Sequence, residues 1–419
     1  MFEGAKRYFV EDLELGMYIC ELDRPWTDTP FIYQGFFLDT EEQVEEIRKY
    51  CKYVFVDVLK QRESVPGLRP MPSPRKKRGT DSKSRKIGKT RHSEEDLPEV
   101  YPVQHGVEQE LGAAERAHSV ADKALQGIIA DIKNKRVPLL THMRDAVSGM
   151  VESVIRNPNA MVWLARLKDL DTYTYAHTID VCAYLLVFGR HLGLPKDDLR
   201  VLGLGGVLMD VGKTKVPLPL LQKRTHLTDS EYELARRHVD LGLEIVRSMK
   251  NVPKRAIEMV HQHHERYDGS GYPQRLVGND TSVFARMAAI ADTFDAISSE
   301  RPYSTALSSH EALRKLYSWA DVLFHKGLVE QFIECLGIYP VGTLVELNTG
   351  EVAIVLAQNR FRQLKPRLVL ILDKEKQPHG TMDVLDLIED PVDDSGIPTE
   401  IARALEPGMY GVEPREFYL

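Results

Sequence analysis

Histidine and aspartate residues recur between residues 161 and 340 within patterns that predict amphipathic helices. The candidate metal ligands are His177, Asp210, His238, His261, His263, His264 and Asp292. Imidazole nitrogens combined with carboxylate oxygens suit Mn, Fe, Zn or Ni. A carboxylate shared by two cations would create a two-metal site, where a water held between the metals becomes a hydroxide near neutral pH. Hydrolysis of a phosphodiester needs that nucleophile, together with positive charge to stabilise the transition state.

Several of these residues also have a structural explanation. Taken alone, His177 is more often a core histidine whose hydrogen bonds are satisfied. On a helix the side chains of His263 and His264 point about 100° apart, so both reach one centre most easily at a helix end. The glycines that follow soon after them favour such an end. His261 points to the opposite side, and we interpret it as structural or solvent-facing.

Asp292 lies in an apolar stretch, residues 290–296, that predicts a buried helix. A carboxylate buried there costs several kcal/mol unless it is paired or bound to a metal. Asp295 follows about one turn later, and we interpret it as a hydrogen-bond or salt-bridge partner.

Residues 263–273 read HHERYDGSGYP. This run matches, without a gap, the HHExxDGxGYP signature of HD-GYP domains, so the chain resembles that family. Further family elements follow in the expected order: YAHT at 175–178, DVGK at 210–213, RHV at 237–239, ADTFDA at 291–296 and RPY at 301–303. The resemblance covers residues 161–340, and residues 1 to about 60 resemble the small domain often fused to this family.

The resemblance implies an HD-superfamily helical fold and an enzyme that hydrolyses the bacterial second messenger cyclic di-GMP to pGpG or GMP. It implies Asp210 as the bridging carboxylate between two divalent ions, Fe, Mn or similar. Carried over by position, the ligands of one ion are His177 and Asp292, and those of the other are His238, His263 and His264.

The resemblance also supplies substrate contacts. Lys213 is expected beside the scissile phosphate, Arg301 against a substrate phosphate, and Tyr272 in the loop that shapes the binding groove. A dianionic ligand needs such cations beside the metals in a protein of net charge −7. The same loop is a candidate contact for diguanylate cyclase domains.

Three positions depart from the family pattern. The residue before Asp210 is Met209 instead of histidine, and a thioether is a poor ligand for hard metals, so we expect the His177 site to be weak. Tyr173 stands where members with three metals carry a glutamate, which predicts two metals at most. Ser304 replaces an often basic residue, so we expect fewer phosphate contacts.

Two alternatives to cyclic di-GMP hydrolysis remain, and the first is motivated by Met209. A catalytically weak or silent module could bind cyclic di-GMP or a partner protein through the loop. Hydrolysis of a different phosphoester is a third possibility, because fold does not fix substrate.

The elements that must position these residues are mostly helical. We predict a small α/β domain at 1–62, a basic disordered linker at 63–100, a helical connector at 101–156, the HD-GYP domain at 157–340 and a β-rich extension at 341–419. Within the first domain, residues 39–47 predict a capped helix and 52–58 a strand. Near the end, residues 341–347, 351–356 and 368–372 predict three strands, the first two joined by a turn at 348–350. The fold class is therefore mainly α.

Composition sets the remaining limits. With 43% hydrophobic residues among 419, the chain can bury real cores, which excludes wholesale disorder. The linker is rich in Pro, Ser, Lys and Arg. Its basic residues could make transient contact with nucleic acid or another polyanion, although such charge runs more often serve as solvated spacers. Four scattered cysteines, no apolar leader and no apolar run of membrane-spanning length favour a cytoplasmic protein. The oligomeric state is open.

Overall fold

The computed structural model describes residues 5–23, 36–38, 41–57, 101–167, 176–223, 225–299, 306–359, 362–380, 383–393 and 396–417. The chain divides into two compact units, Met1–Glu99 and Val100–Leu419, which we describe separately. The predicted linker at 63–100 lies outside the described residues. The five-part division of the chain remains a prediction.

The first unit is a small antiparallel sheet with one helix. Its elements are β1 (Ala5–Phe9), β2 (Tyr18–Leu22), β3 (Phe36–Phe37), α1 (Glu41–Tyr50) and β4 (Tyr53–Asp57), and the strand order is β1-β4-β2-β3. Ile19, Ile47 and Val54 are fully buried in its core. The expected helix and strand are therefore present, while β1, β2 and β3 were not predicted.

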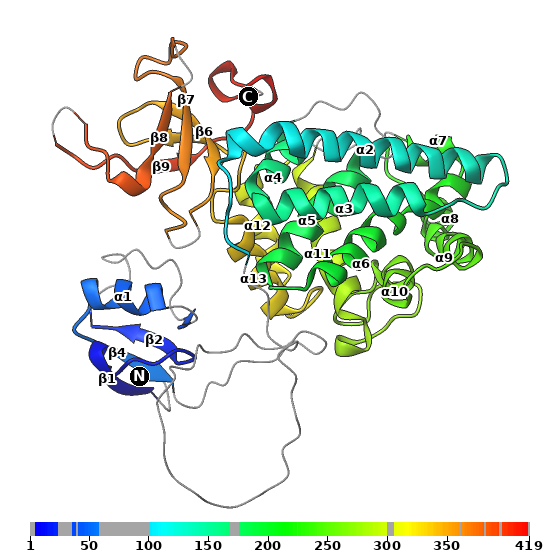
Figure 1. Cartoon of the computed structure of the whole chain (residues 1–419), viewed down its shortest axis with the longest axis horizontal. Coiled ribbons are helices and arrows are strands. Elements are labelled where there is room, and N and C mark those ends of the chain that lie inside the picture. Colours follow the sequence, from blue (N-terminus) through cyan, green and yellow to red (C-terminus); the bar gives the residue numbers. More distant parts are fainter. Residues whose placement is uncertain are drawn as a thin grey trace, which may run out of the picture. The chain divides into compact units, whose positions relative to one another are not determined.

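The second unit is a helical body followed by a sheet (Figure 1). Its helices are α2 (Val107–Lys133), α3 (Thr141–Arg156), α4 (Pro158–Leu167), α5 (Ala176–His191), α6 (Lys196–Leu208), α7 (Leu218–Leu221), α8 (Asp229–Arg236), α9 (His238–Ser248), α10 (Lys254–Gln262), α11 (Val283–Ser298), α12 (Ser309–Ser318) and α13 (Lys326–Leu336). A short 3-10 helix, η4 (Val211–Lys215), follows α6. The mainly α fold class is confirmed.

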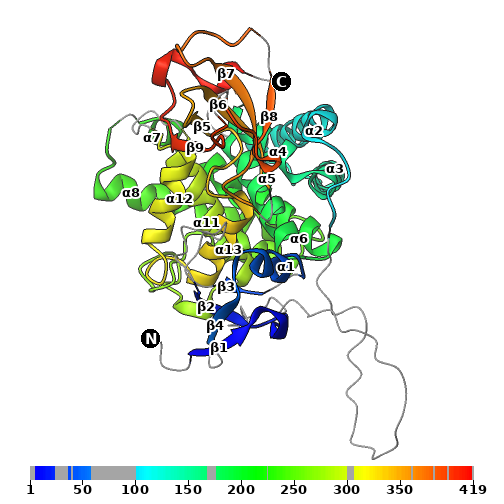
Figure 2. The same cartoon turned by 90° about the vertical axis from the view of Figure 1, so that its left-hand side faces the viewer.

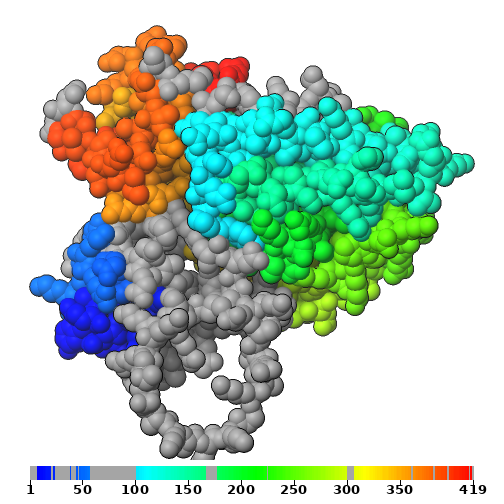
Figure 3. Space-filling model, viewed as in Figure 1, coloured from blue at the N-terminus to red at the C-terminus, as the bar shows by residue number. Residues whose placement is uncertain are grey.

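Helix α2 shows how the sequence pattern becomes packing. Leu111, Ala114, Ala121, Leu125 and Ile128 recur at steps of three, four and seven residues and are all buried. The opposite face of α2 is exposed and mainly charged or small, with Val120 as an exposed apolar residue. Figure 3 shows α2 and α3 side by side along one outer face of the helical body.

An aromatic cluster joins the helices that carry the site. Tyr184 of α5 meets Phe294 of α11 edge to face, with ring centroids 5.2 Å apart. Phe332 of α13 contacts both Phe294 and Phe188 of α5 in the same way. These rings are fully buried. Because such pairs combine large apolar burial with a preferred geometry, they fix α5 against α11.

The chain ends in an antiparallel sheet of β5 (Leu344–Leu347), β6 (Val352–Ala357), β7 (Arg367–Leu372), β8 (Val384–Asp386) and β9 (Ile401–Ala404) (Figure 2). The order is β8-β7-β6-β5-β9. The three expected strands form its centre, and Gly350 adopts a positive φ of 94° in the turn between β5 and β6. The edge strands β8 and β9 were not predicted.

The described helices contain none that is both long and apolar enough to cross a membrane.

Candidate metal centre

The predicted ligands come from separate elements that converge at one place. His177 lies in the first turn of α5, Asp210 just before η4, His238 at the start of α9, and Asp292 in α11. His263 and His264 directly follow α10, which ends at Gln262, so both lie at a helix end as expected. The donor atoms fall into two groups, and within each group all donor atoms lie within 4.8 Å of one another. One group is Asp210, His238, His263 and His264, and the other is His177, Asp210 and Asp292.

Backbone carbonyls orient two imidazoles of the first group. Nδ1 of His238 donates to the carbonyl oxygen of Ala235 at 2.7 Å. Nδ1 of His263 faces the carbonyl oxygens of Met259 and Val260 at 3.2 and 3.1 Å. Because carbonyls only accept hydrogen bonds, both rings carry their proton on Nδ1 and present Nε2 as a lone pair.

Those two Nε2 atoms face a carboxylate oxygen. They lie 3.5 Å (His238) and 3.7 Å (His263) from Oδ1 of Asp210. Burial lowers the pKa of His238 to about 4 despite the attraction of Asp210, so this ring is neutral at pH 7. Burial also holds the pKa of His264 well below its usual value.

The arrangement therefore directs lone pairs at one another. Asp210 Oδ1, His238 Nε2 and His263 Nε2 are buried and have no hydrogen-bond partner. Leaving such acceptors unsatisfied is costly unless a cation lies between them. Neutral imidazoles with a carboxylate fit a divalent metal ion in both donor type and spacing.

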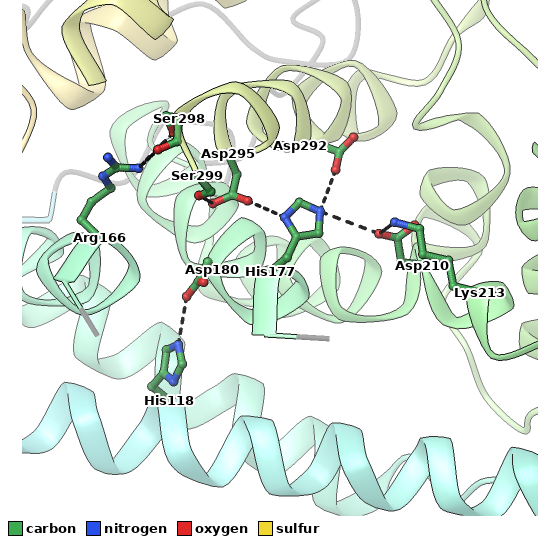
Figure 4. Close-up of polar contacts among 10 residues, drawn as sticks. All are labelled: His118, Arg166, His177, Asp180, Asp210, Lys213, Asp292, Asp295, Ser298 and Ser299. Atoms are coloured by element: carbon green, nitrogen blue, oxygen red, sulfur yellow. Dashed lines mark hydrogen bonds and ion pairs between the residues drawn. The ribbon is translucent and has the colours of Figure 1, made fainter. Parts of the chain in front are cut away.

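The second group is arranged around His177 (Figure 4). Its Nε2 lies 3.0 Å from Oδ1 of Asp292 and 3.9 Å from Oδ2 of Asp210. Burial acts to lower the pKa of His177, but Asp295 and Asp292 outweigh it and raise the pKa to about 10. A metal ion binding to Nε2 must therefore displace a proton.

Lys213 lies one turn after Asp210 and reaches back to it. Its Nζ is 2.6 Å from Oδ2 of Asp210, and its side chain is about one quarter exposed. Burial acts to raise the pKa of Asp210, but Lys213 and the neighbouring imidazoles hold it well below its usual range. Asp210 is therefore ionised and can share its two oxygens between the two donor groups.

A glycine allows Asp210 to lie so near His238. A Cβ at Gly212 would lie 1.9 Å from the carbonyl oxygen of His238 and 2.4 Å from the backbone nitrogen of Gly242. No larger residue fits this contact between η4 and α9. The glycine of the DVGK run is therefore needed for the backbone approach.

The loop after α10 is held by its own signature residues. Glu265 is buried and accepts hydrogen bonds from the backbone nitrogens of Gln274 (2.7 Å) and Leu276 (3.0 Å). A Cβ at Gly271 would lie 2.3 Å from the backbone nitrogen of Arg266, which explains the glycine there. Glu265 thus holds the loop in shape and belongs to neither donor group.

Other predicted residues have simpler positions. His261 is partly exposed, lies 3.7 Å from the exposed Asp240, and belongs to neither donor group. Met209 is fully buried at the end of α6. Arg301, Tyr173 and Ser304 lie outside the described residues. Sequence reasoning missed the role of Glu265, and that of Arg236, whose guanidinium lies 4.3 Å from the ring centroid of Tyr272. It left open which partner Asp295 would have.

Comparisons with known proteins identify the class. The family model described as "HD domain" matches residues 130–325, and the one described as "Domain of unknown function (DUF3391)" matches residues 5–141. A cyclic di-GMP phosphodiesterase from Pseudomonas aeruginosa is 33% identical over 391 residues, which cover 91% of this chain and 89% of that protein.

Two further relatives match shorter stretches of the chain. A cyclic di-GMP phosphodiesterase response regulator from Xanthomonas campestris is 38% identical over 148 residues, 34% of this chain and 38% of that protein. A 3'3'-cGAMP-specific phosphodiesterase from Vibrio cholerae is 34% identical over 162 residues, 38% of this chain and 31% of that protein.

The chain belongs to the HD-GYP family of HD-domain phosphodiesterases, as the signature predicted. Enzymes of this type depend on metal ions, and the two donor groups described above can hold them.

Proposed function

We propose that this chain hydrolyses cyclic di-GMP to pGpG, GMP or both. The observation that carries the proposal is the position of Asp210, whose two oxygens face different donor groups. Oδ1 faces His238 and His263, while Oδ2 faces His177. One ionised carboxylate placed in this way can bridge two divalent ions. The likeness to a cyclic di-GMP phosphodiesterase over 91% of this chain supports the choice of substrate.

The donor sets suggest how two ions, Mn, Fe or similar, would be held. His238, His263 and His264 would ligate one ion, His177 and Asp292 the other, and Asp210 both. The second set has fewer donors because Met209 replaces the family's histidine, so we infer that it binds more weakly. When bound, the ions would lower the pKa of a coordinated water and supply positive charge against the developing negative charge.

The chain's own cations would handle the substrate. Lys213 lies beside Asp210 with its ammonium group partly exposed, so it can contact the scissile phosphate. Arg301 would bind a phosphate as well, and its role rests on the family motif alone. Tyr272 would line the groove, since its ring lies against His264.

The non-catalytic alternative raised by Met209 is not favoured, because the relatives are named as phosphodiesterases. Contact of the loop with diguanylate cyclase domains remains a proposal. A cytoplasmic location also remains a proposal. It is supported by the four widely scattered cysteines, which show no CxxC motif and no repeated spacing.

The decisive experiment follows cyclic di-GMP and its products with the full chain loaded with Mn²⁺ or Fe²⁺. We expect turnover to pGpG or GMP, and a loss of at least about 10³-fold in kcat for Asp210→Asn, which removes the bridging charge. Asp240→Asn is the matched control, because this exposed acid pairs with His261 outside the donor groups.

No turnover with either metal would overturn the proposal. Tight binding of cyclic di-GMP without products would favour the non-catalytic alternative. A parallel assay with 3'3'-cGAMP decides between the two nucleotides named for the relatives.

A further inference from the structure

We propose that Asp295 is the positioning residue that fixes the ring of His177 with Nε2, and not Nδ1, facing the metal centre. The inference rests on the proposed metal site and adds a residue that belongs to neither donor group. It concerns orientation: Asp295 would act through His177 without touching a metal ion or the substrate.

The two nitrogens of His177 have separate carboxylate partners on one helix. Nδ1 is hydrogen-bonded to Oδ2 of Asp295, and Nε2 lies 3.0 Å from Oδ1 of Asp292. Both acids belong to α11 and are three residues apart, so they lie on the same face of that helix. Figure 4 shows the imidazole between them, with Asp210 beyond Nε2.

Asp295 is itself held in place. Asp295 is only 2% exposed. Its Oδ1 accepts a hydrogen bond at 3.2 Å from Oγ of Ser299, which lies one turn further along the chain. Its other oxygen is therefore directed at His177. A buried carboxylate without a partner would cost several kcal/mol, so burial favours the arrangement in which Asp295 is paired with the imidazole.

The contact selects a tautomer. A carboxylate facing Nδ1 keeps the proton there, which leaves Nε2 as the nitrogen that can ligate a metal ion. His238 and His263 obtain the same result from backbone carbonyls. A carboxylate differs from a carbonyl because its charge also raises the basicity of the ring.

This orientation matters most on the His177 side of the centre. His177 is the only imidazole of its donor group among the described residues, because Met209 occupies the position of the family's second histidine. A ring that could rotate would leave that group with carboxylates alone. The three-histidine group has no such dependence.

The test measures Mn²⁺ binding to the full chain after metal removal, by calorimetry and metal analysis, without nucleotide. For Asp295→Asn we expect a 10–100-fold loss of affinity at the weaker Mn²⁺ site and no change at the tighter one. Asp295→Glu, which restores the charge, should recover part of the loss. Unchanged affinity at both sites in Asp295→Asn would overturn the inference.

A matched control separates orientation from general damage. Asp180 is a partly buried carboxylate on α5, three residues after His177, but it pairs with Nε2 of His118 at 3.2 Å. Asp180→Asn should bind Mn²⁺ like the unaltered chain. Equal losses in both variants would show a structural effect and would contradict the inference.

A second measurement does not depend on a folded variant. With ¹⁵N-labelled histidine and Zn²⁺ bound, the unaltered chain should show His177 protonated at Nδ1, and the opposite tautomer would overturn the inference. If the unaltered chain bound neither metal, the proposed function would fail as well. Normal binding with an unaffected Asp295→Asn variant would refute only the role of Asp295.

Discussion

The ring of Tyr272 lies flat against the ring of His264, with centroids 4.7 Å apart and planes 22° from parallel. The guanidinium group of Arg236 lies 4.3 Å from the centroid of the same tyrosine ring. Cation–π contact and ring stacking together hold this side chain of the loop against a candidate metal ligand. The signature tyrosine therefore fixes the ring of His264, in addition to its proposed place in the binding groove.

Replacing Tyr272 separates the ring from the hydroxyl group. Tyr272→Phe keeps the stack, so we expect metal affinity within about twofold of the unaltered chain. Tyr272→Ala frees His264 and should weaken the three-histidine site several-fold, since a contact of this kind is worth about 1 kcal/mol. Titration with Mn²⁺ measures both, and equal losses in the two variants would contradict the stacking role.

Removing a ligand should reduce the metal bound per chain. His264→Ala deletes one imidazole of the three-histidine group, and we expect lower metal content after dialysis against metal-free buffer. His261→Ala is the control, because His261 pairs with the exposed Asp240 and belongs to neither donor group. Unchanged metal content in His264→Ala would show that the ligand assignment is wrong.

Met209→His tests the weak site directly. The new imidazole would add a donor beside Asp210, and we expect tighter binding of the second ion and a higher kcat. Met209→Leu, a swap of similar volume at this fully buried position, controls for packing. If histidine and leucine gave the same metal affinity, position 209 would not be beside the metals.

Gly212→Ala should damage the site through the backbone. The added methyl group would collide with the carbonyl oxygen of His238 and push η4 away from α9. We expect a loss of about 1–3 kcal/mol in the free energy of unfolding and weaker metal binding. Gly127→Ala on α2 is the matched control, since its Cβ would meet nothing within 4 Å; there we expect a gain of up to about 1 kcal/mol.

In the C-terminal sheet, an ion-paired glutamate should make the free energy of unfolding depend on pH, independently of the metal centre. Glu346 of β5 accepts hydrogen bonds from Lys376 (2.6 Å) and Arg403 (2.8 Å), and these contacts lower its pKa despite partial burial. Because the folded-state pKa lies below the unfolded value, the stabilisation is present at neutral pH and disappears as the pH falls through the folded pKa.

Glu346→Gln should therefore lower stability by about 1 kcal/mol at pH 7, a modest value because the partners reach solvent. Thermal unfolding at several pH values measures the difference between variant and unaltered chain. That difference should shrink as the pH falls below about 4, where the carboxyl group of the unfolded chain is already protonated. A constant difference across this range would contradict the account.

The features of the fold and of the site that could be predicted are those that depend on residues close together in the sequence. The pair His263 and His264 followed by glycines indicated a helix end, and α10 ends directly before them. The central strands β5, β6 and β7 appeared as apolar runs with a glycine turn. Both are local patterns, so one stretch of sequence is sufficient to predict them.

What could not be predicted depends on contacts between distant residues. Asp295 was expected to find a partner, but only the packing of α5 against α11 shows that the partner is His177. The edge strands β8 and β9 are short, with partly exposed residues, and they are defined by pairing with β7 and β5. Likewise, the need for glycine at 212 arises from α9, which follows later in the chain.

The donors of the centre are distributed along the chain from His177 to Asp292, on helices that are held together only by tertiary packing. No short fragment can therefore assemble the cage, and unfolding of the bundle must release its ions. A cation that binds only the native form stabilises that form in proportion to its free concentration. The free metal concentration would thus set the stability of the folded protein as well as its activity.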